Sequence, residues 1–304
     1  MLSFLAGRLL QSLVVLFGVS AIVFFCLFLS GDPAALMMPP DASRGEIDAF
    51  RHAMGFDDPL LVQYLRYLGK ALAGDFGTSL RFQRPVLELV LERLPATALL
   101  AVAALAWSTL LGFAFGVLAA VRPGGALDVV VRAVALVGQA MPVFWLGLVL
   151  ILFFAMKWRL LPTSGYGEAR HLVLPALTLG AYYTSAVTRL VRASLIDVMA
   201  EDYIRTARAK GLSTAAVMLR HGLRNALIPV VTVQAMYFAA LLGGALVTEI
   251  IFAWPGIGRL AVQAIQNRDF PLVQAVVLMA AVVFVLANLL VDLAYVMLNP
   301  RVRL

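Results

Sequence analysis

The stretch "EDYIRTARAKGLSTAAVMLRHGLRNALIP", from Glu201 to Pro229, decides how the rest of the chain is interpreted. It holds five arginines or lysines, two acids and a histidine, whereas the sequence on both sides is almost continuously apolar. Acids stand near the start of its first helical pattern, and Arg208 and Lys210 stand near the end, as the helix macrodipole favours. The stretch therefore predicts a short basic helix set between two apolar segments.

A second helix is predicted to follow after a sharp turn. Glu201 and Arg205 form an i,i+4 pair in the favourable order, and Gly211 is placed as the left-handed residue that ends the first helix. Ser213 can cap the next helix, although Ala216 denies it the full capping box. The pattern is that of a helical hairpin.

One face of the first helix carries Tyr203, Ala207 and Gly211, which fall four residues apart. This face is small in its C-terminal half and suits close docking against another protein. Two other interpretations remain open on the residues alone. The hairpin could be a solvated basic loop that only sets topology, or a DNA-binding helix-turn-helix. A membrane span close on each side makes the approach to a major groove implausible, so no nucleic-acid partner is expected.

The composition places the hairpin in a membrane protein. The chain of 304 residues is 62% hydrophobic and 13% charged, with a mean hydropathy of +0.93. Soluble domains carry roughly a quarter charged residues, so the sequence predicts an all-α polytopic membrane protein. The formal net charge of +7 is then explained by basic cytoplasmic loops rather than by nucleic-acid binding.

Six transmembrane helices are expected, because about 20 mainly apolar residues cross the hydrocarbon core. The fourth is the least apolar of them. Their ranges are Leu9 to Leu29, Ala96 to Val121, Val129 to Ala155, Leu172 to about Leu195, Ala226 to Thr248, and Leu272 to Leu298.

The whole chain, residues 1–304, is predicted to be one transmembrane domain with two polar insertions. The first run is too long for the apolar core of a signal peptide and is expected to be a retained span. A small folded insert follows over residues 30–95, and the loop that holds the hairpin covers residues 196–225. The second connection, "RPGGALD", is a tight turn.

The distribution of charge predicts the orientation. The N-terminus, the second connection, the hairpin and the C-terminus are basic, and they fall on one side of a six-span chain. The insert on the other side has nine acidic and seven basic residues, a net charge of −2. By the positive-inside rule, both termini and the hairpin are cytoplasmic and the insert is extracytoplasmic.

Polar residues inside the predicted spans are candidates for a translocation path. Interhelical hydrogen bonding is their simpler role, and a local ion pair or snorkelling explains Arg132. Pro142 frees a backbone carbonyl and can kink the third span. The path candidates are Gln139, Gln234, Tyr237 and Asn288.

No motif for covalent chemistry or cofactor binding is present in the sequence. G-x-x-x-x-G-K-[ST] is absent, so the chain is expected not to bind nucleotide through a P-loop, and neither G-x-S-x-G nor H-E-x-x-H occurs. The three histidines fall in different segments and Cys26 is the single cysteine, so no metal site and no disulfide are expected. No catalytic residue is assigned, and the chain is expected not to be an enzyme.

Motifs along nearly the whole chain resemble those of permease subunits of ABC importers, specifically the dipeptide/oligopeptide/nickel family. The hairpin looks like that family's cytoplasmic EAA loop. The other similar stretches, in order, are "GRLLQSLVVLFGVS", "GDPA", "DDPLLVQYL", "GDFGTSL", "LPAT", "GQAMPVFWLG", "LPTSG", "HLVLPALTLG", "EIIFAWPGIGRLAVQAIQNRDFPLVQA" and "NPRVR". Two departures are Arg205 at the position of the general motif's glutamate and Asn299 where an aspartate often stands.

The resemblance implies a role for each matched position. The EAA loop of such permeases is a coupling helix that enters a cleft of a cytoplasmic ATPase subunit, and the stretch after the fifth span lies near the extracytoplasmic gate. The residues implied in ATPase coupling are Tyr203, Arg205, Ala207, Arg208, Lys210, Gly211, Leu212, Asn225 and Pro229. Those implied in the gate are Trp254, Pro255, Gly256 and Gly258.

The resemblance also implies an assembly in the cytoplasmic (inner) membrane of a bacterium or archaeon. A second homologous permease forms a heterodimer with this chain, two cytoplasmic ATPase subunits bind ATP and Mg, and an extracytoplasmic solute-binding protein delivers the solute. The chain then supplies half of a pathway for peptides or a related small solute by alternating access. The alternative is an ion-coupled secondary transporter, which calls for inverted repeats and ion-coupling groups at the bilayer midplane.

Overall fold

The computed structural model describes residues 2–29, 31–39 and 41–298 of the chain. In this part every regular element is a helix, and the single extended pairing is a bridge between Thr78 and Pro85. The chain forms two compact units. One contains Met1–Thr97 and Pro255–Leu289, and the other contains Ala98–Trp254. The all-α polytopic class predicted from the sequence is confirmed.

The first unit is built around the ends of long apolar helices. Its elements are α1 (Leu2–Leu29), α2 (Pro33–Met37), α3 (Arg44–Met54), α4 (Leu60–Leu72), the start of α5 (Val86–Val121), α13 (Ile257–Gln266) and most of α14 (Phe270–Leu298). Val86 and Val90 of α5 are fully buried in a core with Leu260 and Leu272. Asp269, also fully buried, caps α14 through the amide of Leu272 at 3.3 Å.

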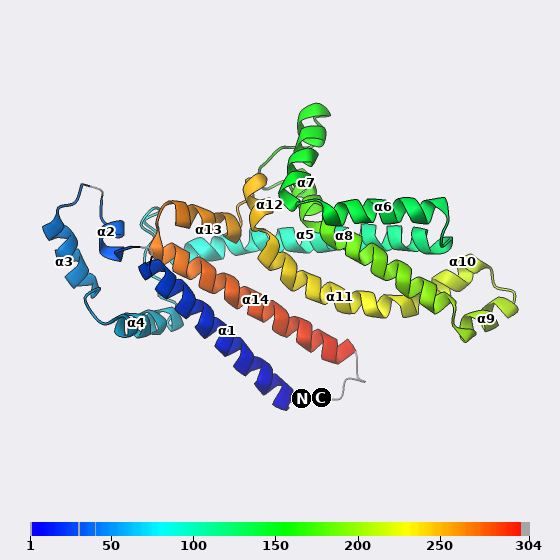
Figure 1. Cartoon of the computed structure of the whole chain (residues 1–304), viewed down its shortest axis with the longest axis horizontal. Helices are drawn as coiled ribbons and strands as arrows, with labels where there is room; N and C mark the ends of the chain where they lie inside the picture. The colour runs from blue at the N-terminus through cyan, green and yellow to red at the C-terminus, as the bar shows by residue number, and fades with distance from the viewer. Residues whose placement is uncertain (1, 30, 40, 299–304) are drawn as a thin grey trace. The chain divides into compact units, whose positions relative to one another are not determined.

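Local sequence signals explain the small helices of this unit. Ser43 and Glu46 form a capping box at the start of α3, and Gly55, with φ of 71°, ends it. Asp32 caps the start of α2, and the extended backbone of Met38 ends that helix before α3 begins. The helices α2, α3 and α4 fall within the predicted insert, and Figure 1 shows them beyond the end of α1.

The second unit is centred on α8 (Ala169–Met199), against which α6 (Ala126–Ala140) and α11 (Leu223–Gly244) pack. Its other elements are the rest of α5, α7 (Val143–Leu150), a π-helical turn (Ile151–Lys157), α9 (Asp202–Ala209), α10 (Thr214–Val217), a second π-helical turn (Met218–Gly222) and α12 (Leu246–Ile251).

Glycines let α5 and α8 approach each other closely. A Cβ added to Gly112 would lie 2.7 Å from Val187 Cβ, and one added to Gly116 would lie 2.6 Å from Val191 Cβ. On the other helix, a Cβ at Gly180 would lie 2.8 Å from the carbonyl oxygen of Ala104. Small residues at helix contacts are the usual means of close packing inside membranes.

The count of membrane spans differs from the sequence prediction. In the described residues three helices are long and apolar enough to cross a membrane, and five candidates result if each of two bent pairs is one span. The predicted fourth span corresponds to α8, which has the length but is not among those candidates. The six-span count therefore stays a prediction.

The predicted third span is not one continuous helix. It is broken at Met141–Pro142 into α6 and α7, which meet at an angle of 110°. The expected proline effect is present, because α6 ends two residues before Pro142. The angle exceeds a simple kink because α7 packs on both α8 and α12.

Two predicted boundaries also shift. The helix of the second span begins at Val86, ten residues before Ala96, and contains Pro95. The fifth span corresponds to α11 followed by the short α12. The segments Met218–Leu227 and Pro229–Gly243, on either side of the start of this span, meet at a bend of 45°.

Candidate functional site

The hairpin lies where α8 ends and α11 begins. Figure 1 shows α9 and α10 beside each other at this end of the second unit. A small core of Ile204, Ala207 and Val217 holds the two helices together, and Met199 at the end of α8 packs against it. Ile204 and Val217 are fully buried. The hairpin is thus folded onto α8 rather than suspended on a loop.

The turn has the geometry predicted for it. Gly211 has a φ of +84°, and its amide donates to the carbonyl of Arg208 at 2.9 Å. No atom lies within 4 Å of where its Cβ would stand, so the backbone dihedral, not space, calls for glycine. Ser213 Oγ accepts from the amide of Ala216 at 3.3 Å, which confirms the predicted cap.

The predicted ion pair of Glu201 with Arg205 is wrong. Arg205 instead pairs with Asp202. Glu201 has extended backbone dihedrals at the N-cap, and its carbonyl accepts from the amides of Ile204 and Arg205. A residue at the N-cap does not follow the helical i,i+4 spacing of side chains, and this explains the change of partner.

The predicted docking face is divided between two sides of the hairpin. Ala207 is 8% exposed and faces the inner core, so its small side chain permits closure of the hairpin on itself. Tyr203 is 42% exposed, and its hydroxyl accepts from Asn225 Nδ2 at 2.7 Å. The outward side carries the exposed residues Arg205, Arg208, Lys210, Gly211 and Leu212.

The second helix of the hairpin continues without a break into the next long helix. It passes from α10 through the π-helical turn directly into α11, and Pro229 lies inside α11. α10 and α11 therefore share a continuous helical backbone. Together with the contact between Tyr203 and Asn225, this joins the hairpin to α11 at two places.

A group of charged side chains, called the brace below, connects α6 to α8. It consists of Asp128, Arg132 and Arg192. The helix α8 leads into the hairpin. Asp128 is 1% exposed and receives two hydrogen bonds from Arg192, at 2.6 and 2.8 Å. The amide of Gly124 donates to it at 2.8 Å, and Arg132 lies 3.2 Å away. The ion pair expected for Arg132 is confirmed.

Asp128 itself was missed by the sequence analysis. It stands at the end of the predicted tight turn, and its main partner is 64 residues further along the chain. No local spacing rule connects the two positions. The available signals in the sequence were an acid at the edge of an apolar run and the two arginines, Arg189 and Arg192, inside the predicted fourth span.

Comparison with known families gives matches over nearly the whole chain. Residues 112–304 match the family described as binding-protein-dependent transport system inner membrane component, and residues 1–101 match the N-terminal family of such membrane components. The chain is an ABC-importer permease of this family.

Curated relatives agree with the assignment. The permease is 43% identical over 304 residues to the glutathione transport system permease protein GsiC of Escherichia coli (strain K12), covering 100% of this chain and 99% of the relative. It is 44% identical, with the same coverage, to GsiC of Salmonella paratyphi A (strain ATCC 9150 / SARB42).

Solved transporters share the fold of the permease. An inward-facing structure of the MetNI methionine ABC transporter aligns with a TM-score of 0.59 at 18% identity, covering 69% of this chain and 96% of that chain. An amino acid ABC transporter aligns with a TM-score of 0.53 at 17% identity, covering 68% and 92%. The family resemblance drawn from the motifs is confirmed.

In the permease, each candidate path residue contacts another side chain or a backbone carbonyl. Gln234 donates to Thr109 of α5 at 2.7 Å, and Gln139 accepts from Arg189 of α8. Tyr237 makes an edge contact with Tyr183 at 4.9 Å between ring centroids. The simpler role in helix packing is observed for the two glutamines.

Asn288, the fourth path candidate, lies in the first unit and donates to the carbonyl of Phe284 at 2.8 Å on its own helix. Its bond is therefore local to α14. The role of all four residues in a path stays a prediction.

Of the candidate gate residues, Trp254, Pro255 and Gly256 lie in the connection between α12 and α13, and Gly258 lies in the first turn of α13. Trp254 is 1% exposed and makes an edge contact with Tyr166, at 4.9 Å between ring centroids. Gly256 is the N-cap of α13, where its extended backbone begins the helix. The role of these residues in gating stays a prediction.

Proposed function

We propose that this permease supplies half of a translocation pathway that works by alternating access. A second homologous permease supplies the other half. Two cytoplasmic ATPase subunits drive the cycle, and an extracytoplasmic solute-binding protein delivers the solute. The family membership supports the ATPase and binding-protein partners, since the matched family is binding-protein-dependent.

The proposed solute is a small peptide or a related compound of the glutathione class. The support is the identity of 43% to a glutathione transport permease over the entire chain. The chain performs no covalent chemistry in this proposal. ATP and Mg are bound by the partner ATPases, and no cofactor is bound by the permease.

The observation that carries the proposal is the way the hairpin is joined to the long helices. Its outward side is basic and exposed, while its inner side packs on Met199 of α8. The hydrogen bond from Asn225 to Tyr203 ties α9 to α11. A force applied to the outward side by an ATPase therefore reaches α8 and α11 together, as a coupling element requires.

The brace at Asp128 extends this connection to α6. Because Arg192 of α8 is held by an acid on α6, a displacement of α8 carries α6 with it. A bidentate contact between guanidinium and carboxylate is both strong and directional. We thus propose that α6, α8 and α11 move together, and that the ATPase acts on them through the hairpin.

The membrane orientation is part of the proposal. The hairpin and both termini lie in the cytoplasm, and the insert with α2, α3 and α4 lies outside the cytoplasmic (inner) membrane. The support is the charge distribution, with a basic surplus at the hairpin and a net charge of −2 on the insert.

The test compares two substitutions at one residue. Gly211→Val forces a β-branched side chain into φ of +84°, whereas Gly211→Asn keeps a residue that tolerates this region. The strain costs about 1–2 kcal/mol, which lowers the population of the correct turn by a factor of roughly 5–30. We expect the Val variant to lose ATP-driven uptake and most co-purified ATPase, and the Asn variant to retain both.

Normal uptake and normal ATPase recovery with Gly211→Val would contradict the coupling role. Uptake that follows an ion gradient and needs no ATPase would instead support the secondary transporter. Size-exclusion profiles of both variants serve as the control for folding.

A further inference from the structure

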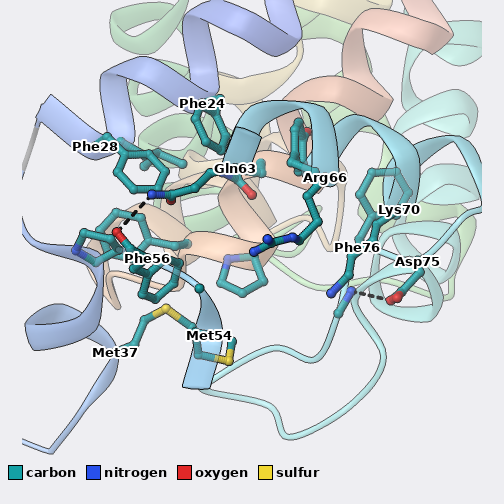
Figure 2. Close-up of a pocket in the computed structure, with 18 residues that line it drawn as sticks. Phe24, Phe28, Met37, Met54, Phe56, Gln63, Arg66, Lys70, Asp75 and Phe76 are labelled. Atoms are coloured by element: carbon teal, nitrogen blue, oxygen red, sulfur yellow. Dashed lines mark hydrogen bonds between the residues drawn. The ribbon is translucent and has the colours of Figure 1, made fainter. Parts of the chain in front are cut away.

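A cavity of about 200 Å³ lies in the first unit, between the end of α1, the face of α4 and the start of α14. Its walls are mainly aromatic and thioether side chains, several of which Figure 2 shows around the opening: Phe24, Phe28, Met37, Met54, Phe56 and Phe76. Such walls accept an apolar group without loss of hydrogen bonds. The cavity is distinct from the coupling hairpin, which belongs to the second unit.

One face of α4 supplies the polar side of this cavity. Gln63, Arg66, Tyr67 and Lys70 fall at positions i, i+3, i+4 and i+7, so all four lie on one side of the helix. Helical spacing thus places an amide, a phenol and two cations along the same wall.

Two buried polar atoms on this wall lack a partner in the described part of the chain. Gln63 is 6% exposed, and its Nε2 donates to the carbonyls of Phe56 and Asp58 at 3.0 and 2.7 Å, which leaves Oε1 without a donor. The hydroxyl of Tyr67 is also unpartnered. Burial raises the pKa of Tyr67 to about 12, so the phenol stays neutral and able to donate. Buried polar atoms without partners are uncommon and call for an occupant.

Charges of both signs stand around the same cavity. Lys70 is exposed and has no carboxylate within ion-pair distance among the described residues. Arg66 lies 2.6 Å from Asp58. Asp75 accepts from the amide of Gly77 at 2.9 Å and carries a negative charge. The lining thus offers cations for an anion and a carboxylate for an ammonium.

We propose that this cavity binds a zwitterionic amphiphile. Its apolar part lies among the phenylalanines and methionines, and its anionic group is bound by Lys70 and the Tyr67 hydroxyl. Its ammonium donates to Gln63 Oε1. Two sources share this chemistry: phosphatidylethanolamine from the outer leaflet, and a short peptide with an apolar side chain.

The place of the cavity favours the lipid. Phe24, Phe28 and Phe270 stand at the ends of two candidate membrane spans, Ala6–Leu29 and Phe270–Leu293. Side chains at the end of a span lie at the level of lipid headgroups. The opposite side of α4 exposes Leu61 and Leu65, as a helix lying on a membrane surface does. If the ligand is instead a peptide, the inference rests on the proposed import function.

The test labels the cavity in the assembled complex in nanodiscs, without ATP. One arm uses a photoactivatable phosphatidylethanolamine, and the other uses a phenylalanine-containing dipeptide with a photoactivatable group. Labelled peptides are mapped by mass spectrometry. We expect labels on α1 or α4, reduced about tenfold by Lys70→Glu, since hydrogen bonds to charged groups are worth more than neutral ones. A smaller reduction is expected for Tyr67→Phe, which removes only the hydroxyl.

Arg44→Glu is the matched control, because it reverses an exposed charge on the same insert away from the cavity. Lipid labelling that the control retains and Lys70→Glu loses supports the proposal with the lipid as source. Dipeptide labelling with the same pattern supports it with the solute as source. No label at the cavity in either arm, or labelling that both Lys70→Glu and Tyr67→Phe leave unchanged, overturns it. Because binding is measured without ATP, loss of uptake in the coupling variants leaves this outcome unaffected.

Discussion

Two long helices, α1 and α8, show opposite relations between hydrophobicity and packing. In the most apolar part of α1 only 11% of the residues are buried. Leu10 and Val14 are 64% and 65% exposed. On α8, in contrast, Thr178, Ser185 and Thr188 are at most 3% exposed. The more polar helix is the one that makes the interior of its unit.

The contrast follows from how these hydroxyls are bonded. Thr178 donates to the carbonyl of Leu174 at 2.8 Å, Ser185 to that of Ala181 at 3.1 Å, and Thr188 to that of Thr184 at 2.8 Å. Each hydroxyl is satisfied on its own helix, so these short side chains can pack closely against other helices. In a membrane protein high hydrophobicity marks exposure to lipid, and small or polar residues mark helix contacts. The fourth predicted span was the least apolar for this reason.

The largest effect is expected at the brace that holds α8 to α6. Asp128→Asn removes the ionic partner of Arg192, whose side chain is 23% exposed. Breaking one member of such a pair leaves a charge that is poorly solvated. We expect most of the detergent-solubilised permease to lose its monodisperse peak at a temperature that the native chain survives.

The matched control for the brace is Asp197→Asn, which neutralises an exposed acid on α8. It is expected to melt as the native chain does. Equal melting of the two variants would mean that the brace does not contribute to stability.

A smaller effect is expected from adding a methyl group at the helix contact. The Cβ of Gly116→Ala would lie 2.6 Å from Val191 Cβ and 2.8 Å from the carbonyl oxygen of Thr188. Overpacking of this kind costs about 1–3 kcal/mol. In α1, Gly18 has no atom within 4 Å of its Cβ position, so Gly18→Ala should gain up to about 1 kcal/mol from helix propensity. Thermal melting of both variants measures the difference, and a stabilising Gly116→Ala would refute the close contact.

The smallest effect is expected on the exposed side of α1. Leu13 is 63% exposed, so Leu13→Ala should change the unfolding free energy of the isolated chain by no more than about 0.5 kcal/mol. The measurement is denaturant unfolding of the purified chain in detergent. A loss of unfolding free energy above about 1 kcal/mol would contradict this, because it would mean that the Leu13 side chain is packed against other residues.

Features with a local cause were predictable from the sequence. The left-handed Gly211, the cap at Ser213 and the break at Pro142 each depend on the dihedral preferences or hydrogen bonding of one or two residues. The membrane class follows from composition alone. These signals act within a few residues and need no knowledge of what packs nearby.

Features that depend on distant partners were not predictable. Ala207 faces inward because Val217 of the following helix completes its core. The brace joins Asp128 to a residue 64 positions away. The helix of the second span starts early because Val86 and Val90 are buried against α13 and α14. In each case the sequence showed the residue type, and tertiary contacts determined its role.

The most direct test of the account places a photocrosslinking residue at position 212 and, as a control, at position 160. Leu212 lies on the outward side of the hairpin and is 38% exposed, while Leu160 is 67% exposed and follows the π-helical turn after α7. Cells are irradiated, and the adducts are identified by mass spectrometry. The account predicts an adduct with an ATPase that carries a P-loop at position 212 and none at position 160. No ATPase adduct at 212, or equal adducts at both positions, would contradict the hairpin as the coupling element.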